Sequence, residues 1–339
     1  MLRIPLQELK DTLNQLLLQY GFSEEKASLS ARLLAEASLD GVASHGLNRV
    51  PRYINTIKKG YVQPDKSPVK ISENGAIQTW DGQLGPGNTN AHFCMEQAID
   101  MAKSNGIGLV ALRNTNHWMR GGAFGWQAAD ADMAGICWSN TKPNMPAWGA
   151  NKNILGNNPL IIAIPRSEGH VVLDMAMSQF SFGKVESYKR KGEDLPFDGG
   201  YDKAGKLTKN PAIIEETELA LPIGYWKGAG LSLMLDLLAA LLSAGKATHE
   251  IGRGVEEEYG LSQVFIAIDL ASKNQDNFIA EKVKGILKDL HAAPTFDKNG
   301  KTFYPGERTL ATRKENLEKG VPVDEGYWEQ VKGMLKNEI

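Results

Sequence analysis

The sequence predicts an α/β protein whose strand-rich central part lies between helical ends. Apolar residues in the first 40 positions recur at threes and fours, which is typical of helices with one buried face. From about residue 70, short apolar runs bounded by Gly, Asn or Pro alternate with helical stretches. We therefore expect a helical domain of residues 1–70 with 308–339, and an α/β domain of residues 71–307.

The helical ends have clear boundary signals. Gly21 should end the first helix, Ser23 should cap the second, and Asp324 should cap the last. The first apolar stripe consists of Leu6, Leu9, Leu13, Leu16, Leu17 and Tyr20. A DNA-reading helix-turn-helix is not favoured here, because neither of the first two helices has a basic exposed face.

Five runs in the central part are predicted strands. They are "GIGLVALRN", "AGICWSN", "NPLIIAIP", "HVVLDMAMS" and "SQVFIAIDL". A helical stretch is expected within "HWMRGGAFGWQAADADM". The nearly all-apolar "GLSLMLDLLAALLSAG" predicts a buried helix, and "FDGGYDKAGKLTKNP" an exposed turn or hairpin.

Composition narrows the class of protein. The formal charge is −2, which argues against nucleic acid or an anionic membrane as the main partner. Cys94 and Cys137 form no CxxC pair, so we expect two reduced thiols. The N-terminal stretch lacks a signal-peptide core, and Asp236 interrupts the longest apolar run. These features predict a cytoplasmic protein.

Common cofactor and nucleophile motifs are missing. The nearest approach to GxGxxG, around Gly106 and Gly108, precedes a strand instead of following one. The segment "GYDKAGK" lacks the Ser or Thr of a phosphate loop. No HExxH, clustered His/Cys set or GxSxG occurs, so we expect neither a metal site nor a serine nucleophile elbow.

The segment "VASHGLNRVPRYI" carries the main candidate for chemistry. A helix beginning near Asn48 would place Pro51 in its first turn, where the missing N–H costs little. His45 would then lie in the connection and Arg49 in the first turn. The pair could be a proton donor beside an anion clamp, or an ordinary surface histidine and arginine.

Three further segments have weaker signals. His117 follows a predicted strand and precedes a glycine pair, which is a common site position. Lys227 opens the apolar helix in a Gly-rich turn, where an ammonium and backbone N–H groups could bind an anion. "YPGERT" is a turn by spacing alone. Taken singly, each segment has an ordinary structural explanation.

Together these segments resemble the malate/L-lactate dehydrogenase family that lacks a Rossmann fold. The resemblance spans almost the whole chain and is carried by long ungapped runs. They include "GIGLVALRNTNHWMRGGAFGWQAA", "GICWSN", "NPLIIAIP", "GYWKGAGLSLMLDLLAALLS" and "EYGLSQVFIAID". It implies a nicotinamide-dependent reductase of a 2-keto acid, a mixed and largely antiparallel cofactor-binding sheet, and a homodimer.

The resemblance also implies roles for particular residues. His45 is the expected proton donor and Arg49 the partner of the substrate carboxylate, with Ser44 and His117 in the same pocket. The implied cofactor contacts are Leu173, Asp174, Met175, Ala176, Trp226, Lys227, Gly306, Glu307 and Arg308.

Some choices stay open at this point. NADH is the expected cofactor, but departures from relatives at Asn157, at Glu307 and in the loop 166–170 keep NADPH as an alternative. The long runs favour a keto sugar acid as substrate, with malate, lactate or ureidoglycolate-type substrates as alternatives. A binding or scaffold protein that lost turnover is the competing class.

Overall fold

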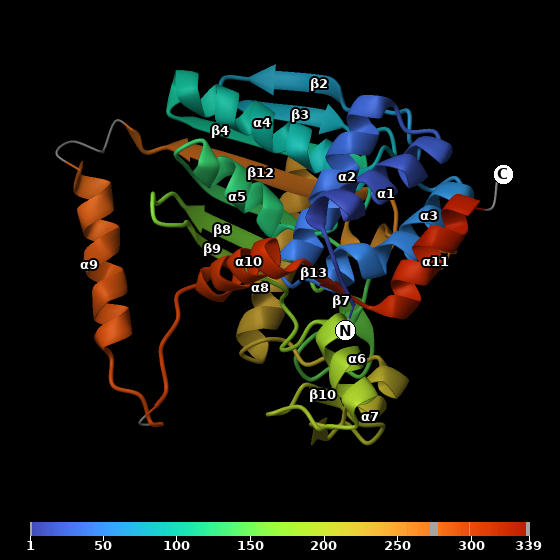
Figure 1. Ribbon diagram of the computed structural model, residues 1–339, viewed down its shortest axis with the longest axis vertical. Coiled ribbons are helices and arrows are strands. Elements are labelled where there is room, and N and C mark those ends of the chain that lie inside the picture. The colour runs from blue at the N-terminus through green and yellow to red at the C-terminus, as the bar shows by residue number, and fades with distance from the viewer. Residues whose placement is uncertain (1, 256, 272–276, 298, 337–339) are drawn as a thin grey trace.

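The computed structural model describes residues 2–255, 257–271, 277–297 and 299–336. Within these residues, one seven-stranded sheet forms the centre of the molecule, with strand order β2-β3-β4-β12-β5-β8-β9 (Figure 1). Its strands are β2 (Val69–Asn74), β3 (Ile77–Asp81), β4 (Ile107–Thr115), β5 (Met133–Ser139), β8 (Leu160–Ile164), β9 (Val171–Met175) and β12 (Leu261–Asp269). The five predicted strands are confirmed.

The sheet is mixed. Strands β3 and β4 are parallel, and every other neighbouring pair in it is antiparallel. Strand β12 returns from late in the chain to lie between β4 and β5, so that Val264 faces Ala111 on one side and Trp138 on the other. Strand β9 is an edge strand, and its outer edge is therefore accessible to other segments.

Alternation along the strands gives the sheet two apolar faces. Val110 and Phe265 pack with α4 (Gly87–Asn105) and α5 (Gly122–Asp130) on one face. Ala111 and Val264, the neighbours in sequence, pack on the opposite face with α8 (Trp226–Ser243). The predicted helical stretch after His117 is α5.

The terminal segments pack together. Helices α1 (Leu6–Gln19), α2 (Glu24–Leu39), α3 (Val50–Lys58) and α11 (Glu325–Lys336) share one core. Strand β1 (Leu2–Ile4) pairs antiparallel with β13 (Val321–Val323). The Ser23 side chain accepts from the Lys26 N–H, and Asp324 accepts from the Gly326 N–H, so both predicted caps are confirmed.

Smaller elements surround the central layers. The segment after β9 forms α6 (Phe182–Lys191), the hairpin β10 (Gly200–Tyr201) with β11 (Leu207–Thr208), and α7 (Pro211–Thr217). The predicted hairpin is thus confirmed. The remaining elements are β6 (Met145–Pro146), β7 (Asn153–Leu155), the 3₁₀ turn η3 (Thr248–Glu250), α9 (Phe278–Ala292) and α10 (Glu307–Lys319). Helix α9 stands apart from the sheet (Figure 1).

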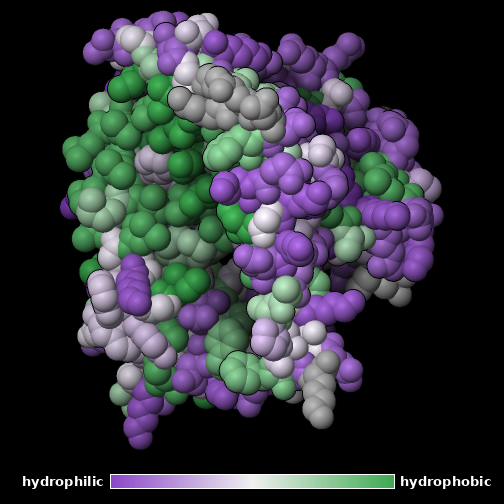
Figure 2. Space-filling model, turned by 90° about the vertical axis from the view of Figure 1, so that its left-hand side faces the viewer, coloured by the Kyte–Doolittle hydropathy of each residue, from purple (hydrophilic) through white to green (hydrophobic). Residues whose placement is uncertain are grey.

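The prediction that the apolar helix α8 is buried was only half right. One side packs on the sheet, where the Asp236 carboxylate accepts hydrogen bonds from the Asn140 side chain and the Thr248 N–H. The other side is exposed: its apolar side chains are Leu231, Leu233, Met234, Leu237, Leu238 and Leu241, the last 75% exposed. Figure 2, in which the left-hand side of the Figure 1 view faces the reader, shows a broad hydrophobic area on the surface. Periodicity could not reveal this, because α8 is apolar all round.

Helix α8 is also, among the described helices, the one with the length and apolar composition to cross a membrane. Its contacts instead place it against the sheet. The buried and hydrogen-bonded Asp236, and the bond from the Trp138 indole N–H to the Leu235 carbonyl, tie it to the sheet. A helix fixed in this way is a layer of the protein.

The His45 segment forms two consecutive 3₁₀ turns, η1 (Ala43–His45) and η2 (Leu47–Arg49), before α3. Pro51 lies in the first turn of α3, as expected, but the predicted Asn48 cap was wrong. Asn48 lies within η2, its side-chain oxygen has no hydrogen-bond partner among the described residues, and Arg49 occupies the N-cap position without a side-chain cap.

Gly46 lets this segment approach α2 closely. A Cβ at this position would lie 2.2 Å from the Ser38 Oγ and 2.7 Å from the Leu34 carbonyl oxygen. The same Ser38 hydroxyl accepts from the Leu47 N–H at 2.9 Å. The absence of a side chain at position 46 therefore fixes where His45 and Arg49 lie relative to α2.

We predict that Gly46→Ala lowers the free energy of unfolding by about 1–3 kcal/mol, because buried backbone must shift to make room. Thermal and denaturant unfolding measure the change. Gly333→Ala in α11 is the matched control, since a Cβ there meets nothing within 4 Å, and it should be neutral or slightly stabilising. Equal stability of the two variants would contradict the proposed close approach.

Candidate functional site

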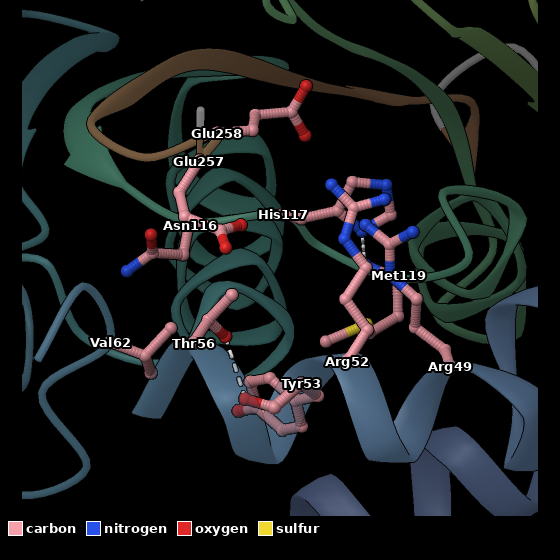
Figure 3. A pocket seen from close by; sticks show the side chains of 10 residues that line it. All are labelled: Arg49, Arg52, Tyr53, Thr56, Val62, Asn116, His117, Met119, Glu257 and Glu258. Atoms are coloured by element: carbon pink, nitrogen blue, oxygen red, sulfur yellow. Dashed lines mark hydrogen bonds between the residues drawn. The ribbon is translucent and has the colours of Figure 1, made fainter. Parts of the chain in front are cut away.

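A narrow pocket lies between α3, the loop after β4 and the segment before β12 (Figure 3). The described residues that line it are Arg49, Arg52, Tyr53, Thr56, Val62, Asn116, His117, Met119, Glu257 and Glu258. Arg49, Arg52 and His117 converge on one side, and Asn116 and Glu257 lie on the other. One side of the pocket is therefore basic.

His45 and His117 stack beside this basic side. Their ring centroids are 5.7 Å apart and their planes differ by 22°. The Met119 N–H donates to His117 Nδ1 at 3.0 Å, which leaves Nε2 of the neutral ring to carry the proton. The Ser44 Oγ lies 3.1 Å from His45 Nδ1. Neither Ser44 nor His45 is among the residues that line the pocket; His45 lies beside it, stacked on His117.

Arg49 and Arg52 are three residues apart and therefore lie on the same side of the chain. Within the described residues, neither side chain has a hydrogen bond or an ion pair. Burial and the nearby Arg52 lower the pKa of Arg49 to about 10, so the guanidinium is still charged at neutral pH. The Arg49 side chain is thus available to bind an anion such as a carboxylate.

Both histidines are neutral at pH 7. Burial, followed by the charge of Arg49, lowers the pKa of His45 to about 4. Burial and the same arginine also lower the pKa of His117 well below its ordinary value. The unfolded chain therefore binds more protons than the folded protein between about pH 6.5 and 4, and stability falls as the pH drops through this window.

Four side chains of alternating charge form a series near His45: Arg313, Asp40, Arg120 and Asp174. The Arg120 guanidinium bonds to the Asp40 carboxylate, and its Nε lies 3.8 Å from Asp174 Oδ2. Arg313 of α10 bonds to the second Asp40 oxygen at 2.9 Å. Asp174 raises the pKa of His45, and Arg120 lowers it.

The predicted cofactor contacts on β9 lie at the edge of the sheet. Asp174 Oδ2 accepts from the Gly122 N–H at 2.9 Å, at the start of α5. Gly306 approaches the backbone of β9 so closely that a Cβ would lie 3.1 Å from the Val172 nitrogen. The Glu307 carboxylate accepts from the Tyr304 N–H, and Arg308 lies over the Phe303 ring. These contacts connect two of the predicted cofactor segments, around β9 and at the start of α10.

The third predicted cofactor segment lies at the start of α8. The residues just before α8 contact the residues just after β9. The Ile223 N–H donates to the Met177 carbonyl, and Met175 packs in the same apolar cluster as Ile223. Trp226 is 66% exposed. Lys227 follows in the first turn of α8. Neither residue lines the pocket described above.

Sequence reasoning missed several residues that the structure gathers here. Arg52, Asn116 and Glu258 line the pocket, and Arg120 lies behind it. Two signals were available: Arg52 follows Arg49 by three positions, and Arg120 stands in a glycine-rich turn directly after His117. Glu257 and Glu258 had no such signal in the sequence, because only the tertiary fold brings their segment close to α3.

Comparison with known proteins identifies the family. The family model described as malate/L-lactate dehydrogenase matches residues 4–332. The chain belongs to the malate/L-lactate dehydrogenase family. It is therefore an oxidoreductase, as the resemblance in the sequence predicted. Two relatives named 2,3-diketo-L-gulonate reductase, from Citrobacter koseri and Klebsiella pneumoniae, are each 42% identical over 98% of this chain and 100% of their own length.

Solved structures give the same fold. Sulfolactate dehydrogenase from Methanocaldococcus jannaschii is 31% identical with a TM-score of 0.90, covering 98% of this chain and 96% of that one. Malate dehydrogenase from Entamoeba histolytica is 28% identical with a TM-score of 0.92, covering 98% and 97%. The fold is thus shared by family members whose names give different substrates.

We predict that Arg49→Gln raises the pKa of His45, because it removes the positive charge that lowers this pKa most while leaving the ring in its buried position. Imidazole resonances followed by NMR as a function of pH, with His45→Gln to assign the signal, measure the shift. An unchanged pKa would show that Arg49 does not act on His45. Arg32→Gln is the control, since Arg32 lies beside His92 and should move that histidine's pKa instead.

Proposed function

We propose that this protein is an NADH-dependent reductase that converts 2,3-diketo-L-gulonate to 3-keto-L-gulonate. The observation that carries the proposal is the stacked pair of His45 and His117 beside the unpaired Arg49. The names of the relatives that match over their full length supply the substrate. Malate, lactate or a ureidoglycolate-type 2-hydroxy acid is the alternative, and malate and lactate occur in the names of structural neighbours.

Arg49 is the proposed partner of the substrate carboxylate. A guanidinium can hold a carboxylate through two parallel hydrogen bonds, which fixes the orientation of the neighbouring carbonyl. Arg52 adds positive charge from the same side. The polar side chains across the pocket, Asn116 and Glu257 among them, are suited to the hydroxyl groups of a sugar acid.

His45 is the proposed proton donor. When bound, NADH supplies the hydride to the 2-keto carbon, and negative charge develops on the carbonyl oxygen. A protonated His45 gives its proton to that oxygen, and a hydroxyl group results. Because the pKa of His45 is lowered in the free protein, we infer that the bound carboxylate restores its proton by offsetting Arg49.

The residues at the edge of the sheet suit a nicotinamide cofactor. The Val172 N–H points away from β8 and bonds to the Pro305 carbonyl, so the N–H and C=O of Asp174, two residues on, face the same outer edge. These groups match the donor and acceptor of a carboxamide. Lys227 and the first turn of α8 suit a pyrophosphate. The mixed sheet and the missing GxGxxG support a binding mode unlike the Rossmann fold, with NADPH as an alternative cofactor.

The first test is NADH oxidation by the purified protein with 2,3-diketo-L-gulonate, pyruvate, oxaloacetate or no substrate, repeated with NADPH. We expect the fastest turnover on the diketo sugar acid. Turnover only on the simple keto acids would keep the site and refute the substrate. Turnover on none of them, with NADH still bound, would favour the non-catalytic alternative.

We predict that His45→Ala lowers kcat by about 10²–10⁴ and changes KM little, because the proton donor acts in the transition state. Arg49→Gln should mainly raise KM. Steady-state kinetics on the best substrate measure both. His249→Ala, an exposed histidine on η3, is the control and should retain wild-type rates. An active His45→Ala enzyme would refute the role of His45.

We propose in addition that two copies of the chain form a homodimer through α8. Its exposed side combines Met234, Leu237, Leu238 and Leu241 in one apolar surface, and monomers rarely leave such a surface in water. A second copy is the favoured occupant because the family resemblance implies a dimer. The cytoplasmic location also stays a prediction.

We predict that Leu238→Glu with Leu241→Glu converts the dimer to a monomer, because two carboxylates would be buried in the interface. Light scattering after size-exclusion chromatography measures the mass. Leu18→Glu, an exposed leucine on α1, is the control and should leave the mass unchanged. A wild-type monomer, or a dimer that survives both substitutions, would refute the interface.

A further inference from the structure

We propose that Glu257 and Glu258 select the tail of the substrate: they favour a 2-keto acid whose tail carries hydroxyl groups over one whose tail carries a second carboxylate. This proposal rests on the proposed function, because it takes Arg49 as the partner of the first carboxylate. It deepens that function by naming the side chains that distinguish a sugar acid from a dicarboxylic acid. Both glutamates line the same pocket as Arg49.

The first step is the place of the acids in the pocket. Arg49, Arg52 and His117 converge on one side, and Glu257 lies on the other (Figure 3). In a 2-keto acid the carboxylate and the tail lie on opposite sides of the keto carbon. A substrate held by its carboxylate at Arg49 therefore extends its tail towards the side of the pocket that carries Glu257.

The second step is that two hydrogen bonds fix the carboxylates. The Lys59 ammonium donates to Glu257 Oε1 at 2.7 Å, and the Lys142 backbone N–H donates to Glu258 Oε2 at 3.1 Å. The Glu257 side chain is only 14% exposed. Both acids are thus held at the pocket, although they belong to the segment before β12 and their donors lie elsewhere in the chain.

The third step concerns the oxygens that these bonds leave over. Within the described part of the chain, Glu257 Oε2 and Glu258 Oε1 accept no hydrogen bond. A carboxylate oxygen accepts hydrogen bonds and cannot donate them. These two oxygens therefore suit a tail with hydroxyl donors. A second carboxylate on the substrate is itself only an acceptor, so it can form no hydrogen bond with them.

The fourth step is charge. The hydrogen bond from Lys59 lowers the pKa of Glu257, so this side chain is ionised at neutral pH while the ammonium partly offsets its charge. Glu258 is bonded to a backbone N–H, which has no net charge to offset the carboxylate. A second substrate carboxylate would meet like charge here, and one such repulsion at close range changes relative affinity by about tenfold.

Arg52 provides the competing interpretation. It lines the pocket, and no described residue forms an ion pair with its side chain, so it can attract a second anion. However, Arg52 lies on the same side as Arg49, where the first carboxylate is bound. The tail extends away from that side, so the glutamates are the charged groups that it meets.

The test measures kcat/KM with NADH on oxaloacetate and on pyruvate, which share the 2-keto acid group and differ in the second carboxylate. Glu258→Gln and Glu257→Gln each remove one negative charge and should raise the ratio of oxaloacetate to pyruvate by about tenfold. Glu258→Asp keeps the charge and should keep the wild-type ratio. Activity on 2,3-diketo-L-gulonate relative to pyruvate should fall by about fivefold in both glutamine variants, because a charged acceptor is lost.

The matched control is Glu73→Gln. Glu73 on β2 also pairs with a lysine, Lys70 at 2.6 Å, but it does not line the pocket, so its loss should leave the ratio unchanged. If Glu257→Gln does not fold because the bond to Lys59 is lost, Glu258→Gln carries the test alone. If no keto acid is turned over, calorimetric titration with L-malate and L-lactate compares the same second carboxylate without catalysis.

A higher ratio in Glu258→Gln, with the wild-type ratio in Glu258→Asp and Glu73→Gln, supports the proposal. An unchanged ratio in Glu258→Gln, or an equal rise in the control, would overturn it. A wild-type enzyme that prefers oxaloacetate over pyruvate would also overturn it and would assign the second anion to Arg52. Failure of the proposed function is a separate result, namely slow turnover of 2,3-diketo-L-gulonate by the wild type, because the ratio does not involve the sugar acid.

Discussion

Burial of two histidines beside the charged Arg49 is the constraint on which the site depends. Arg49, Arg52 and His117 line one side of a narrow pocket, and His45 stacks on His117. Arg49 stays charged at neutral pH, whereas both histidines are neutral. Burial, followed by the charge of Arg49, lowers the proton affinity of His45. The substrate carboxylate that we propose as the partner of Arg49 would offset that charge.

The rest of the fold holds these groups in place. Gly46 brings the His45 turn against α2, and Asp40 at the end of α2 binds Arg120. His117 follows the end of β4, and Asp174 lies on β9, four positions further along the strand order of the sheet. Each group comes from an element fixed by its own apolar core, so the site is assembled by packing.

Helix α8 shows how one element serves two surfaces. Its buried side carries Asp236, which bonds to Asn140 and Thr248, and its outer side carries leucines. A large apolar surface that is exposed on a monomer usually marks a site where another molecule binds. The proposed second copy would do so and would lie next to the first turn of α8, where Lys227 is placed.

The sequence by itself determined the elements and the family. Apolar periodicity located α1, α2 and the five predicted strands, and Ser23 and Asp324 marked helix ends, because these signals are local. The family resemblance implied the roles of His45, Arg49 and His117. Only the tertiary structure decided that β12 lies between β4 and β5, that α8 has an exposed side, and that Asp40, Arg120 and Asp174 form one chain of charges. Those contacts join residues up to 161 positions apart in β4 and β12, such as Ile268 and Ile107, or depend on side-chain directions, and no local pattern encodes either.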